Sequence, residues 1–462
     1  MSVNMTAFST LPLSKPLLEN LGQLGFEAMT PIQAEALPLI FEGSDLIAKA
    51  KTGSGKTVAF GLGVLHKLNP KQFATQALVL CPTRELADQV AVEIRRLART
   101  MANVKVLTLC GGLPMGAQIG SLEHGAHIIV GTPGRILKHI KAGRLEFADL
   151  NTLVLDEADR MLDMGFEADI NAIKERLPHQ RQTLLFSATY PEQIEQLAAR
   201  VQRQPKMVEI EGSEIQEQIT QRLIEVPPSA KASMVKAVLG RYKPESTVVF
   251  CNTKRACQQV ADELEDAGVS VVALHGDKDQ RDRDQMLVRF ANKSASVLVA
   301  TDVAARGLDI KDLSMVINYD VAFESEVHVH RIGRTGRAGS KGMAITLAAG
   351  GEIHRVLEIE ELQGHEFQRI EADSLPEPKQ LHLQPPMVTL SIGAGRKSKL
   401  RPGDILGALT SKKVIEGKSV GKITVMDRLS YVAVDRKVAS KALKLLQNDK
   451  IKGRKLVVRQ HK

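Results

Sequence analysis

The sequence predicts an α/β protein with two successive parallel-sheet domains and a small α+β domain at the C-terminus. Two observations predict this class. Short apolar runs rich in Val, Ile and Leu alternate with longer helical patterns twice over, which is typical of parallel sheets covered by helices on both faces. After Pro386 this alternation gives way to a different order of short strands and helices.

The predicted strands of the larger part form two groups of five. The first group covers residues 45–49, 77–81, 127–131, 152–156 and 183–187, and the second covers residues 246–251, 270–274, 296–300, 315–318 and 343–347. A polar stretch at 209–218 separates the groups, and a Pro-rich polar stretch at 372–386 follows the second. We therefore expect one domain over residues 1–208 and another over residues 219–371.

A third domain is expected over residues 387–462. Its predicted strands cover residues 388–392, 422–426, 431–434 and 455–459, and its predicted helices cover residues 403–409 and 438–447. This βαββαβ order is the RRM-like arrangement.

The net charge of +9 is concentrated in this third domain. Residues 383–462 contain 19 Lys and Arg against five Asp and Glu, a charge of +14, whereas the remaining 43 basic and 48 acidic residues give −5. Such asymmetry predicts a polyanion-binding module appended to a nearly neutral body. A basic face that only aids solubility is the alternative, but the apolar periodicity of the segment favours a folded domain.

The composition predicts a cytoplasmic globular protein. The chain of 462 residues is 43% hydrophobic and 25% charged, no apolar run reaches the roughly 18 residues of a membrane span, and the N-terminus lacks a signal-peptide pattern. The four cysteines, Cys81, Cys110, Cys251 and Cys257, show neither a C-x-x-C pair nor neighbouring histidines. We expect buried thiols in a reducing compartment rather than a zinc site or disulfides.

Residues 50–57, Ala-Lys-Thr-Gly-Ser-Gly-Lys-Thr, follow a predicted strand and precede a helical pattern. The backbone N–H groups of such a loop form a cradle for phosphates. Lys56 would reach the β- and γ-phosphates, and the Thr57 hydroxyl would bind Mg²⁺. Ala50 stands where the general pattern has Gly, so the strict motif is missed by one residue. The nucleotide-binding candidates are Thr52, Gly53, Ser54, Gly55, Lys56 and Thr57.

An acidic quartet, Asp156-Glu-Ala-Asp159, follows the apolar strand around Val154. A carboxylate at the carboxyl end of a strand beside a phosphate loop is where Mg²⁺ is held. We predict that Asp156 binds the metal and that Glu157 orients or deprotonates the attacking water. With Lys56, these two residues are the catalytic candidates of the first domain.

At this point the sequence resembles the DEAD-box RNA helicases, over about residues 8–347. The resemblance implies two tandem RecA-like domains, with ATP and Mg²⁺ as cofactors and RNA as partner. Gly25-Phe26 and Thr30-Pro-Ile-Gln33 resemble the family's adenine-recognition element, which implies that Phe8 stacks on adenine and that Gln33 bonds the base edge. Phe8 as an ordinary core residue is the alternative.

Further family motifs follow in order in both domains. Pro82-Thr-Arg-Glu-Leu86, Gly111-Gly112 and Thr132-Pro-Gly-Arg135 resemble RNA-contacting elements, as do Phe250-Cys-Asn-Thr253, residues 280–283 and residues 300–309. In Ser187-Ala-Thr189, the element coupling ATP to RNA, both hydroxyls would engage Asp159. The implied RNA-binding residues are Thr83, Arg84, Gly112, Thr132, Arg135, Thr253, Arg283 and Thr301.

The string His330-Arg-Ile-Gly-Arg-Thr-Gly-Arg337 is the most specific in the second domain. By the resemblance, Arg334 and Arg337 contact the γ-phosphate and stabilise charge during phosphoryl transfer. His330 and Arg331 would support the interface, His330 as a coupling residue, and Asp309 would bind the ATP ribose. The implied enzyme is an RNA-dependent ATPase that separates strands locally, and we expect a monomer.

The basic C-terminal domain resembles that of one bacterial subgroup of this family. There it directs the helicase to large-subunit ribosomal RNA, near the peptidyl-transferase centre, which implies a role in ribosome assembly. Ordinary RRM domains stack bases on aromatic residues of the sheet. Here Tyr431 is the single aromatic residue and Thr389 takes the corresponding place on the first strand, so we expect recognition through basic residues, among them Arg396, Lys397, Lys399 and Arg401.

Two other functions fit parts of the pattern. A DNA translocase shares the nucleotide chemistry, but the Gln33 element and the Thr-Pro-Gly-Arg set argue against it. An RNA clamp, which uses ATP to lock onto RNA and hold partners without unwinding, uses the same motifs as a helicase. The sequence leaves this second alternative open.

Overall fold

The computed structural model describes residues 7–50, 53–112, 114–210, 219–305, 313–336, 342–378, 380–381, 383–411 and 414–461. These residues fall into two compact units, one up to residue 210 and one from residue 219 onward. Residues 211–218 of the predicted linker lie outside the described ranges, and Glu209 ends a strand instead. Among the described residues, no helix has the length and apolar character needed to cross a membrane.

The first unit is built on a parallel sheet with the strand order β3-β4-β2-β5-β6-β1-β7. All five predicted strands of this half are confirmed, as β1, β2, β4, β5 and β6. Edge strands β3 and β7 were not predicted, because they are only partly buried and lack a continuous apolar run. The strands are β1 (Leu46–Lys49), β2 (Ala77–Leu80), β3 (Val106–Leu109), β4 (Ile128–Gly131), β5 (Thr152–Asp156), β6 (Gln182–Ser187) and β7 (Lys206–Glu209).

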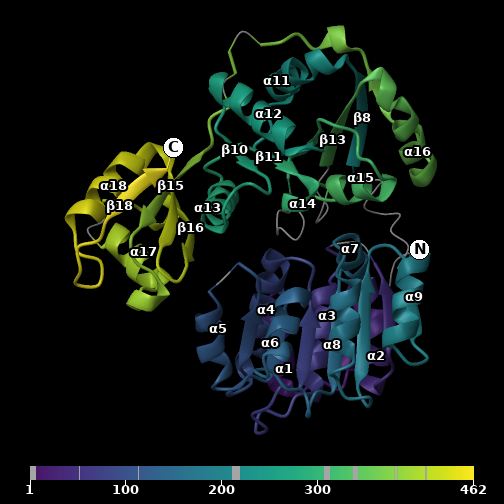
Figure 1. The fold of residues 1–462 in the computed structure, drawn as a ribbon. Coiled ribbons are helices and arrows are strands. Elements are labelled where there is room, and N and C mark those ends of the chain that lie inside the picture. The colour runs from purple at the N-terminus through teal and green to yellow at the C-terminus, as the bar shows by residue number, and fades with distance from the viewer. Residues whose placement is uncertain are drawn as a thin grey trace. The chain divides into compact units, whose positions relative to one another are not determined.

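Helices cover both faces of this sheet (Figure 1). Successive residues of a strand point to opposite faces, so Leu46 and Ala48 join one core cluster and Ile47 joins the other. The helices are α1 (Lys15–Gln23), α2 (Pro31–Glu42), α3 (Lys56–Lys67), α4 (Arg84–Leu97), α5 (Met115–Leu122), α6 (Pro133–Lys141), α7 (Ala158–Asp163), α8 (Glu167–Lys174) and α9 (Glu192–Val201).

The second unit contains a parallel sheet in the order β10-β11-β9-β12-β13-β8-β14. The five predicted strands are confirmed as β9 to β13. Strand β8 was missed because polar residues such as Gln221 alternate with its apolar ones, and β14 is a three-residue edge strand. The strands are β8 (Ile219–Glu225), β9 (Thr247–Cys251), β10 (Val271–Leu274), β11 (Val297–Thr301), β12 (Met315–Asn318), β13 (Gly342–Ala348) and β14 (Gln368–Ile370), with helices α11 (Lys231–Tyr242), α12 (Lys254–Asp266), α13 (Gln280–Ala291), α14 (Asp302–Ala305), α15 (Ser325–Ile332) and α16 (Ile353–Gln363).

The C-terminal part of the second unit carries its own antiparallel sheet, in the order β16-β17-β15-β18. The predicted βαββαβ order is confirmed, although the last strand begins three residues later than expected. Apolar residues of one sheet face and of both helices form a separate core cluster. The elements are β15 (Met387–Ile392), α17 (Pro402–Thr410), β16 (Val420–Val425), β17 (Ser430–Asp435), α18 (Ala439–Asn448) and β18 (Val458–His461). The four cysteines are free and buried, as expected.

His328 on α15 is a fully buried histidine of the second unit. Its Nε2 lies 3.0 Å from the amide oxygen of Gln221, and its Nδ1 lies 3.5 Å from the amide nitrogen of Asn318. The neutral ring with a proton on Nε2 therefore donates to the first and accepts from the second. Burial, with a smaller contribution from Arg331, lowers the pKa of His328 to about 3.

We expect acid to destabilise the second unit through this histidine. Its folded pKa of about 3 lies below its ordinary value of 6.5, so between these two pH values the unfolded chain binds a proton that the folded unit does not. The free energy of unfolding should fall by about 1.4 kcal/mol per pH unit below pH 6.5. Urea unfolding between pH 7.5 and pH 5 measures this slope. His328→Gln should reduce the slope of unfolding free energy against pH, and the exposed control His354→Gln should not. Equal slopes in the unaltered protein and both variants would show that His328 does not cause the loss of stability.

Candidate functional site

The phosphate loop connects β1 to α3 in the first unit. The Ala50 N–H donates to the Ser187 carbonyl at 3.0 Å, which fixes the start of the loop beside β6. Lys56 is buried, and its Nζ donates to the Ala50 carbonyl at 2.7 Å, so the lysine spans the loop. The Ser54 hydroxyl is buried and has no hydrogen-bond partner among the described residues. Thr52 lies outside the described residues.

Gln33 packs directly against this loop. Its amide nitrogen donates to the Gly55 carbonyl at 3.1 Å, while its amide oxygen accepts from the Thr30 N–H at 2.9 Å. Gly55 has φ 99°, and a Cβ there would lie 2.4 Å from the Gln33 nitrogen, so the position requires glycine. Phe8 is buried in the core of the first unit. Its stacking on adenine stays a prediction.

Asp156 ends β5 and is buried. Burial raises its pKa to about 7, with Lys56 opposing the shift and Glu157 and Asp159 adding to it. A bound cation would offset this cost, so the position fits Mg²⁺. Among the described residues no group of three or more His, Cys, Asp or Glu could hold a metal. Mg²⁺ usually binds through one or two protein ligands and the phosphates of the substrate. The Asp156 carboxylate and the hydroxyl of the half-buried Thr57 would supply those two protein ligands.

Glu157 lies at the sharp turn between β5 and α7. Its backbone is left-handed, with φ 53° and ψ 54°, and its side chain is buried. The Arg160 guanidinium donates to its carboxylate at 2.9 Å, with both side chains buried. Arg160 therefore fixes the orientation of the predicted catalytic carboxylate. This role could not be predicted from the sequence, because Arg160 belongs to none of the motifs described above.

Asp159 connects the acidic quartet to the turn after β6. One carboxylate oxygen accepts from the backbone N–H groups of Ala188 and Thr189, each at 3.0 Å, and from the Thr189 hydroxyl at 3.1 Å. The expectation that the Ser187 hydroxyl also engages Asp159 is wrong. Ser187 ends β6 with its side chain buried, and its hydroxyl has no partner among the described residues.

The RNA-binding candidates of the first unit follow three neighbouring strands, in the order β3-β4-β2. Gly112 follows β3, Thr132 follows β4, and Thr83 and Arg84 follow β2. Because these strands are parallel, their carboxyl ends meet at one edge of the sheet. Gly112, Thr132 and Arg135 line a hollow of about 530 Å³. The buried Gln118, which the sequence did not single out, accepts from Arg135 at 2.9 Å and holds it in place.

Gly112 and Arg84 pack so tightly that we expect Gly112→Ala to weaken RNA binding. Gly112 has φ 73°, and an added Cβ would lie 1.7 Å from Nη1 of Arg84, so the guanidinium must move. Losing one charged contact should lower RNA affinity about tenfold. Gly111→Ala is a matched control, because its Cβ would meet nothing within 4 Å. Fluorescence anisotropy with single-stranded RNA measures the affinity of both variants. An affinity of Gly112→Ala equal to that of the unaltered protein would contradict RNA binding by Arg84.

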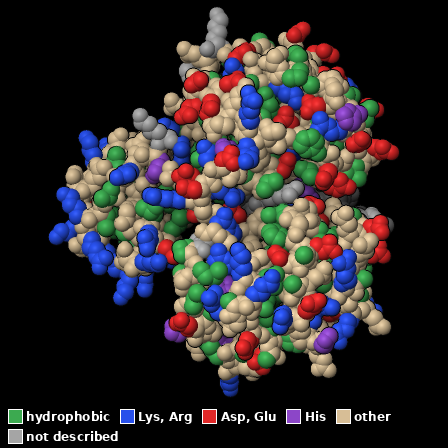
Figure 2. Space-filling view, viewed as in Figure 1, with side chains coloured by type: hydrophobic (Ala, Val, Ile, Leu, Met, Phe, Trp, Pro, Cys, Tyr) green, Lys and Arg blue, Asp and Glu red, His purple; other side chains and the backbone are tan. Residues whose placement is uncertain are grey.

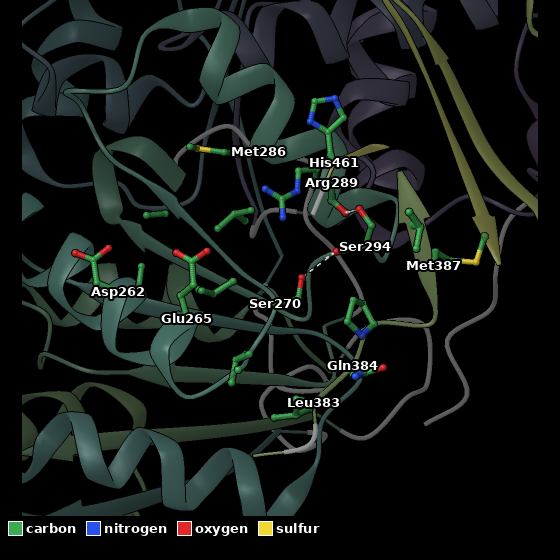
Figure 3. A pocket seen from close by; sticks show the side chains of 18 of the residues that line it. Asp262, Glu265, Ser270, Met286, Arg289, Ser294, Leu383, Gln384, Met387 and His461 are labelled. Carbon is green, nitrogen blue, oxygen red and sulfur yellow. Dashed lines mark hydrogen bonds between the residues drawn. The ribbon is translucent and has the colours of Figure 1, made fainter. Parts of the chain in front are cut away.

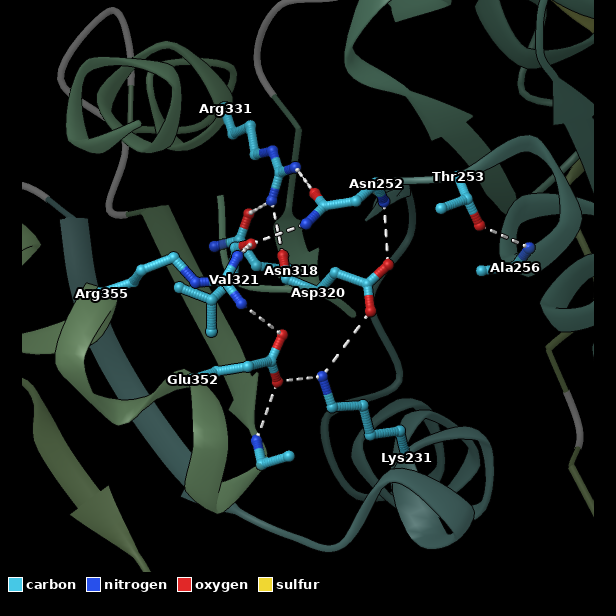
Figure 4. Close-up of polar contacts among 11 residues, drawn as sticks. Lys231, Asn252, Thr253, Ala256, Asn318, Asp320, Val321, Arg331, Glu352 and Arg355 are labelled. Atoms are coloured by element: carbon cyan, nitrogen blue, oxygen red, sulfur yellow. Dashed lines mark hydrogen bonds and ion pairs between the residues drawn. The ribbon is translucent and has the colours of Figure 1, made fainter. Parts of the chain in front are cut away.

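Arg331 joins two of the predicted RNA-binding strand ends in the second unit, and Figure 4 shows its contact with one of them, at Asn252. Its guanidinium donates to both carboxylate oxygens of Asp302, at 2.6 and 2.7 Å, and to the Asn252 side chain at 2.7 Å. Asn252 precedes Thr253, and Asp302 follows Thr301. Arg331 is only 1% exposed and makes these contacts inside the second unit, and its support of the interface stays a prediction.

Lys231 extends this network. It is 4% exposed, and its Nζ lies 2.6 Å from the Glu352 carboxylate and 3.7 Å from that of Asp320. Asp320 in turn accepts from the Asn252 N–H at 2.8 Å. A buried ammonium with two carboxylates thus fixes the backbone next to Thr253. Lys231 could not be predicted from the sequence, because its partners lie about 90 to 120 residues away along the chain. No motif marks the position of Lys231 itself.

The other candidates of the second unit are placed as follows. Arg283 lies in the first turn of α13 and His330 lies near the end of α15, and both residues are half-buried. Arg334 follows α15 and is buried. Asp309 and Arg337 lie outside the described residues. The roles assigned to these residues stay predictions.

The sheet face that binds bases in ordinary RRM domains is covered in this chain. Thr389 and Tyr431 are buried. The Thr389 hydroxyl lies 2.6 Å from that of Ser294 and 3.2 Å from the Asn292 amide, at the end of α13. His461 of β18 contacts Gln285 of α13 at 3.1 Å. The end of α13, in the parallel-sheet part of the second unit, therefore covers the stacking face, whereas the sequence showed only that this face lacks aromatic residues.

A cavity of about 480 Å³ lies along this seam (Figure 3). Asp262 and Glu265 line it from α12, Arg289 from α13 and His461 from β18. By contrast, the predicted recognition residues Arg396 and Lys397 are exposed in the loop after β15, where Arg396 lies 3.3 Å from the Asp427 carboxylate. Lys and Arg side chains gather over the surface of this C-terminal part (Figure 2).

Comparisons with known proteins agree with this geometry. Residues 30–197 match the DEAD/DEAH box helicase family, residues 230–339 the helicase conserved C-terminal domain and residues 389–460 the DbpA RNA binding domain. The chain is 53% identical over 458 residues to the ATP-dependent RNA helicase DbpA of Escherichia coli (strain K12), covering 98% of this chain and 99% of the relative. It is 38% identical to DbpA of Bacillus subtilis (strain 168), with the same coverage.

A solved structure shares the fold of the two parallel-sheet units. Dbp5 of S. cerevisiae bound to RNA and ADP BeF3 aligns with a TM-score of 0.73 at 30% identity, over 80% of this chain and 96% of that one. Two such parallel sheets, with a phosphate loop and an acidic strand end in the first, together with the matches to the helicase family models, place the chain among the helicases. The chain belongs to the DEAD-box family of ATP-dependent RNA helicases, and within it to the DbpA type.

Proposed function

We propose that this helicase remodels large-subunit ribosomal RNA during ribosome assembly, as a monomer. The observation that carries the proposal is the C-terminal domain, which matches the DbpA RNA binding domain. Its stacking face is occupied by α13, while basic loops such as the one with Arg396 and Lys397 are exposed. A domain held in this way would deliver a bound RNA hairpin at a fixed position relative to the parallel sheet of the second unit.

The first unit would hold and hydrolyse the nucleotide. Lys56 and the loop N–H groups bind the phosphates, Gln33 bonds the adenine, and Thr57 and Asp156 hold Mg²⁺. Bound Mg²⁺ would neutralise charge developing on the phosphates. Glu157, oriented by Arg160, takes the proton of the attacking water.

RNA would be held through its backbone along the strand ends of both units. Thr83, Arg84, Thr132 and Arg135 act in the first unit, and Thr253, Arg283 and Thr301 in the second. ATP and RNA both favour the closed arrangement of the two units and so bind cooperatively. Closure brings in Arg334 and Arg337, which makes hydrolysis depend on RNA.

The target is tested by ATPase rate against RNA concentration. The ATPase rate of the full-length protein is measured with three nucleic acids: ribosomal RNA containing the peptidyl-transferase hairpin, RNA lacking this hairpin, and DNA. We expect half-maximal stimulation at a much lower concentration of the hairpin RNA, and an Arg396→Ala/Lys397→Ala variant should lose this preference. A Lys243→Ala control, altered outside the C-terminal domain, should keep it. Equal stimulation by the two RNAs would reject the ribosomal target while leaving the RNA-dependent ATPase intact.

A further inference from the structure

The cavity of about 480 Å³ shown in Figure 3 lies within the second unit, where the C-terminal part meets the parallel-sheet part. Helices α12 and α13 line it from the parallel-sheet part. The segment around Pro385, Arg436 and strand β18 line it from the other side. None of the nucleotide-binding or RNA-binding motifs described above contributes a residue to this lining, so the cavity needs a separate explanation.

Two buried N–H groups at this cavity have no acceptor. Arg289 lines the cavity from α13, and its Nε is buried without a hydrogen-bond partner among the described residues. His461 lines it from β18, and its Nδ1 lies 3.1 Å from the amide nitrogen of Gln285. That amide nitrogen can only donate, so the neutral ring carries its proton on Nε2. The Nε2 is also buried and unpartnered in the described structure. Because unpaired buried donors are costly, both groups favour an incoming acceptor.

The charges around these donors favour an acceptor that is an anion. Arg289 forms no ion pair with the residues that the structure describes. Burial lowers its pKa, and Glu265 opposes this shift only in part. Burial also lowers the pKa of His461, with further contributions from Arg289 and Arg459. An oxyanion could accept from both N–H groups and would offset the positive charge that the site holds half-buried.

The wall formed by α12 distinguishes a small anion from a nucleic acid. Asp262 and Glu265 line the cavity from this helix and are exposed. Two carboxylates would repel the successive phosphates of an RNA strand. They can, however, accept hydrogen bonds from the hydroxyl or amino groups of a small molecule. The cavity is also larger than a single phosphate ion, which leaves room for such a molecule.

We propose that this cavity binds a small phosphorylated metabolite that also carries hydroxyl or amino groups, with its phosphate on Arg289 and His461. Arg289 belongs to α13 and His461 to β18, so the phosphate would join the parallel-sheet part to the C-terminal part. Ligand binding and docking of the C-terminal part would therefore strengthen each other. The inference is independent of the ribosomal target proposed above.

The site is tested by isothermal titration calorimetry of the full-length protein, saturated with ADP and Mg²⁺ to fill the nucleotide site. Ribose 5-phosphate should bind at one site and more tightly than inorganic phosphate, and ribose should not bind. Arg289→Gln should lower the affinity for ribose 5-phosphate about tenfold or more, as expected for a charged hydrogen bond. His461→Phe keeps a ring but has no donor, and should lower this affinity about fivefold.

Two further variants separate the site from general effects. Arg255→Gln removes an exposed arginine of α12 that does not line the cavity, and the affinity for ribose 5-phosphate should not change. Thr389 does not line the cavity either, but its hydroxyl contacts Ser294 and Asn292 where the C-terminal part docks. Thr389→Val should therefore weaken ribose 5-phosphate binding through the loss of docking.

Three results would overturn the proposal. The first is that neither ribose 5-phosphate nor inorganic phosphate binds the unaltered protein. The second is that Arg289→Gln and His461→Phe bind ribose 5-phosphate as tightly as the unaltered protein does. The third is that Arg289→Gln weakens binding of single-stranded RNA while ribose 5-phosphate does not bind, which would identify the occupant as an RNA phosphate.

Discussion

A Glu157→Gln variant is expected to bind ATP and RNA normally and to hydrolyse ATP about 10²- to 10⁴-fold more slowly. Glutamine has the shape of glutamate and can still accept from Arg160, which lies 2.9 Å from the native carboxylate. It cannot take a proton from water. Because the residue is buried in a left-handed turn that leads into α7, the isosteric change should leave the backbone intact.

Single-turnover hydrolysis and nucleotide binding, measured separately, check this expectation. Glu167→Gln is a matched control: Glu167 lies in the next helix, α8, where it forms an exposed ion pair with Arg200. Its turnover should match that of the unaltered protein. Normal turnover in Glu157→Gln would remove Glu157 from the catalytic residues, and loss of ATP binding would make its role structural.

Replacement of Arg334 by alanine is expected to lower RNA-stimulated hydrolysis by about 10³-fold or more, the effect of removing an arginine that stabilises the transferring phosphoryl group. RNA affinity without nucleotide should stay similar, because this arginine acts on ATP. Arg334 is only 8% exposed in the described structure, and its carbonyl accepts from the Leu313 N–H at 3.2 Å. The backbone hydrogen bond is kept in the variant.

Two further variants make this measurement specific. Arg369→Ala removes an exposed arginine that pairs with Glu225 on the same unit, and stimulation should stay normal. Arg331→Ala should instead lower the unfolding temperature, since it leaves Asp302 and Asn252 without their buried partner. Full RNA stimulation in Arg334→Ala would contradict the assignment of Arg334 to the transition state.

Strands that read as continuous apolar runs could be predicted from the sequence, and strands with polar residues among their apolar ones could not. Strands such as β5 and β9 are buried on both faces and read as continuous apolar runs. Edge strands β3, β7 and β14 expose part of their side chains, and β8 alternates polar with apolar residues, so their sequences resemble loops.

The candidate site shows the same division. Motif residues such as Lys56 and Asp156 were predicted because their types and their place after strands carry the chemistry. The residues that hold these motifs in place were not predicted. Gln118, Arg160 and Lys231 act through hydrogen bonds whose partners come together only in the folded chain. The covered sheet face was also invisible, since Asn292 and Ser294 are ordinary polar residues until they meet Thr389.

ATP hydrolysis by this chain is expected to separate RNA strands, whereas an RNA clamp would use ATP only to lock onto RNA. It is tested most directly by displacement of a short labelled strand from a duplex that adjoins the ribosomal hairpin. We predict displacement that requires ATP, is weaker without the hairpin, and is lost in Glu157→Gln. RNA-stimulated ATP hydrolysis without displacement would contradict the account and show that the chain is an ATP-controlled clamp.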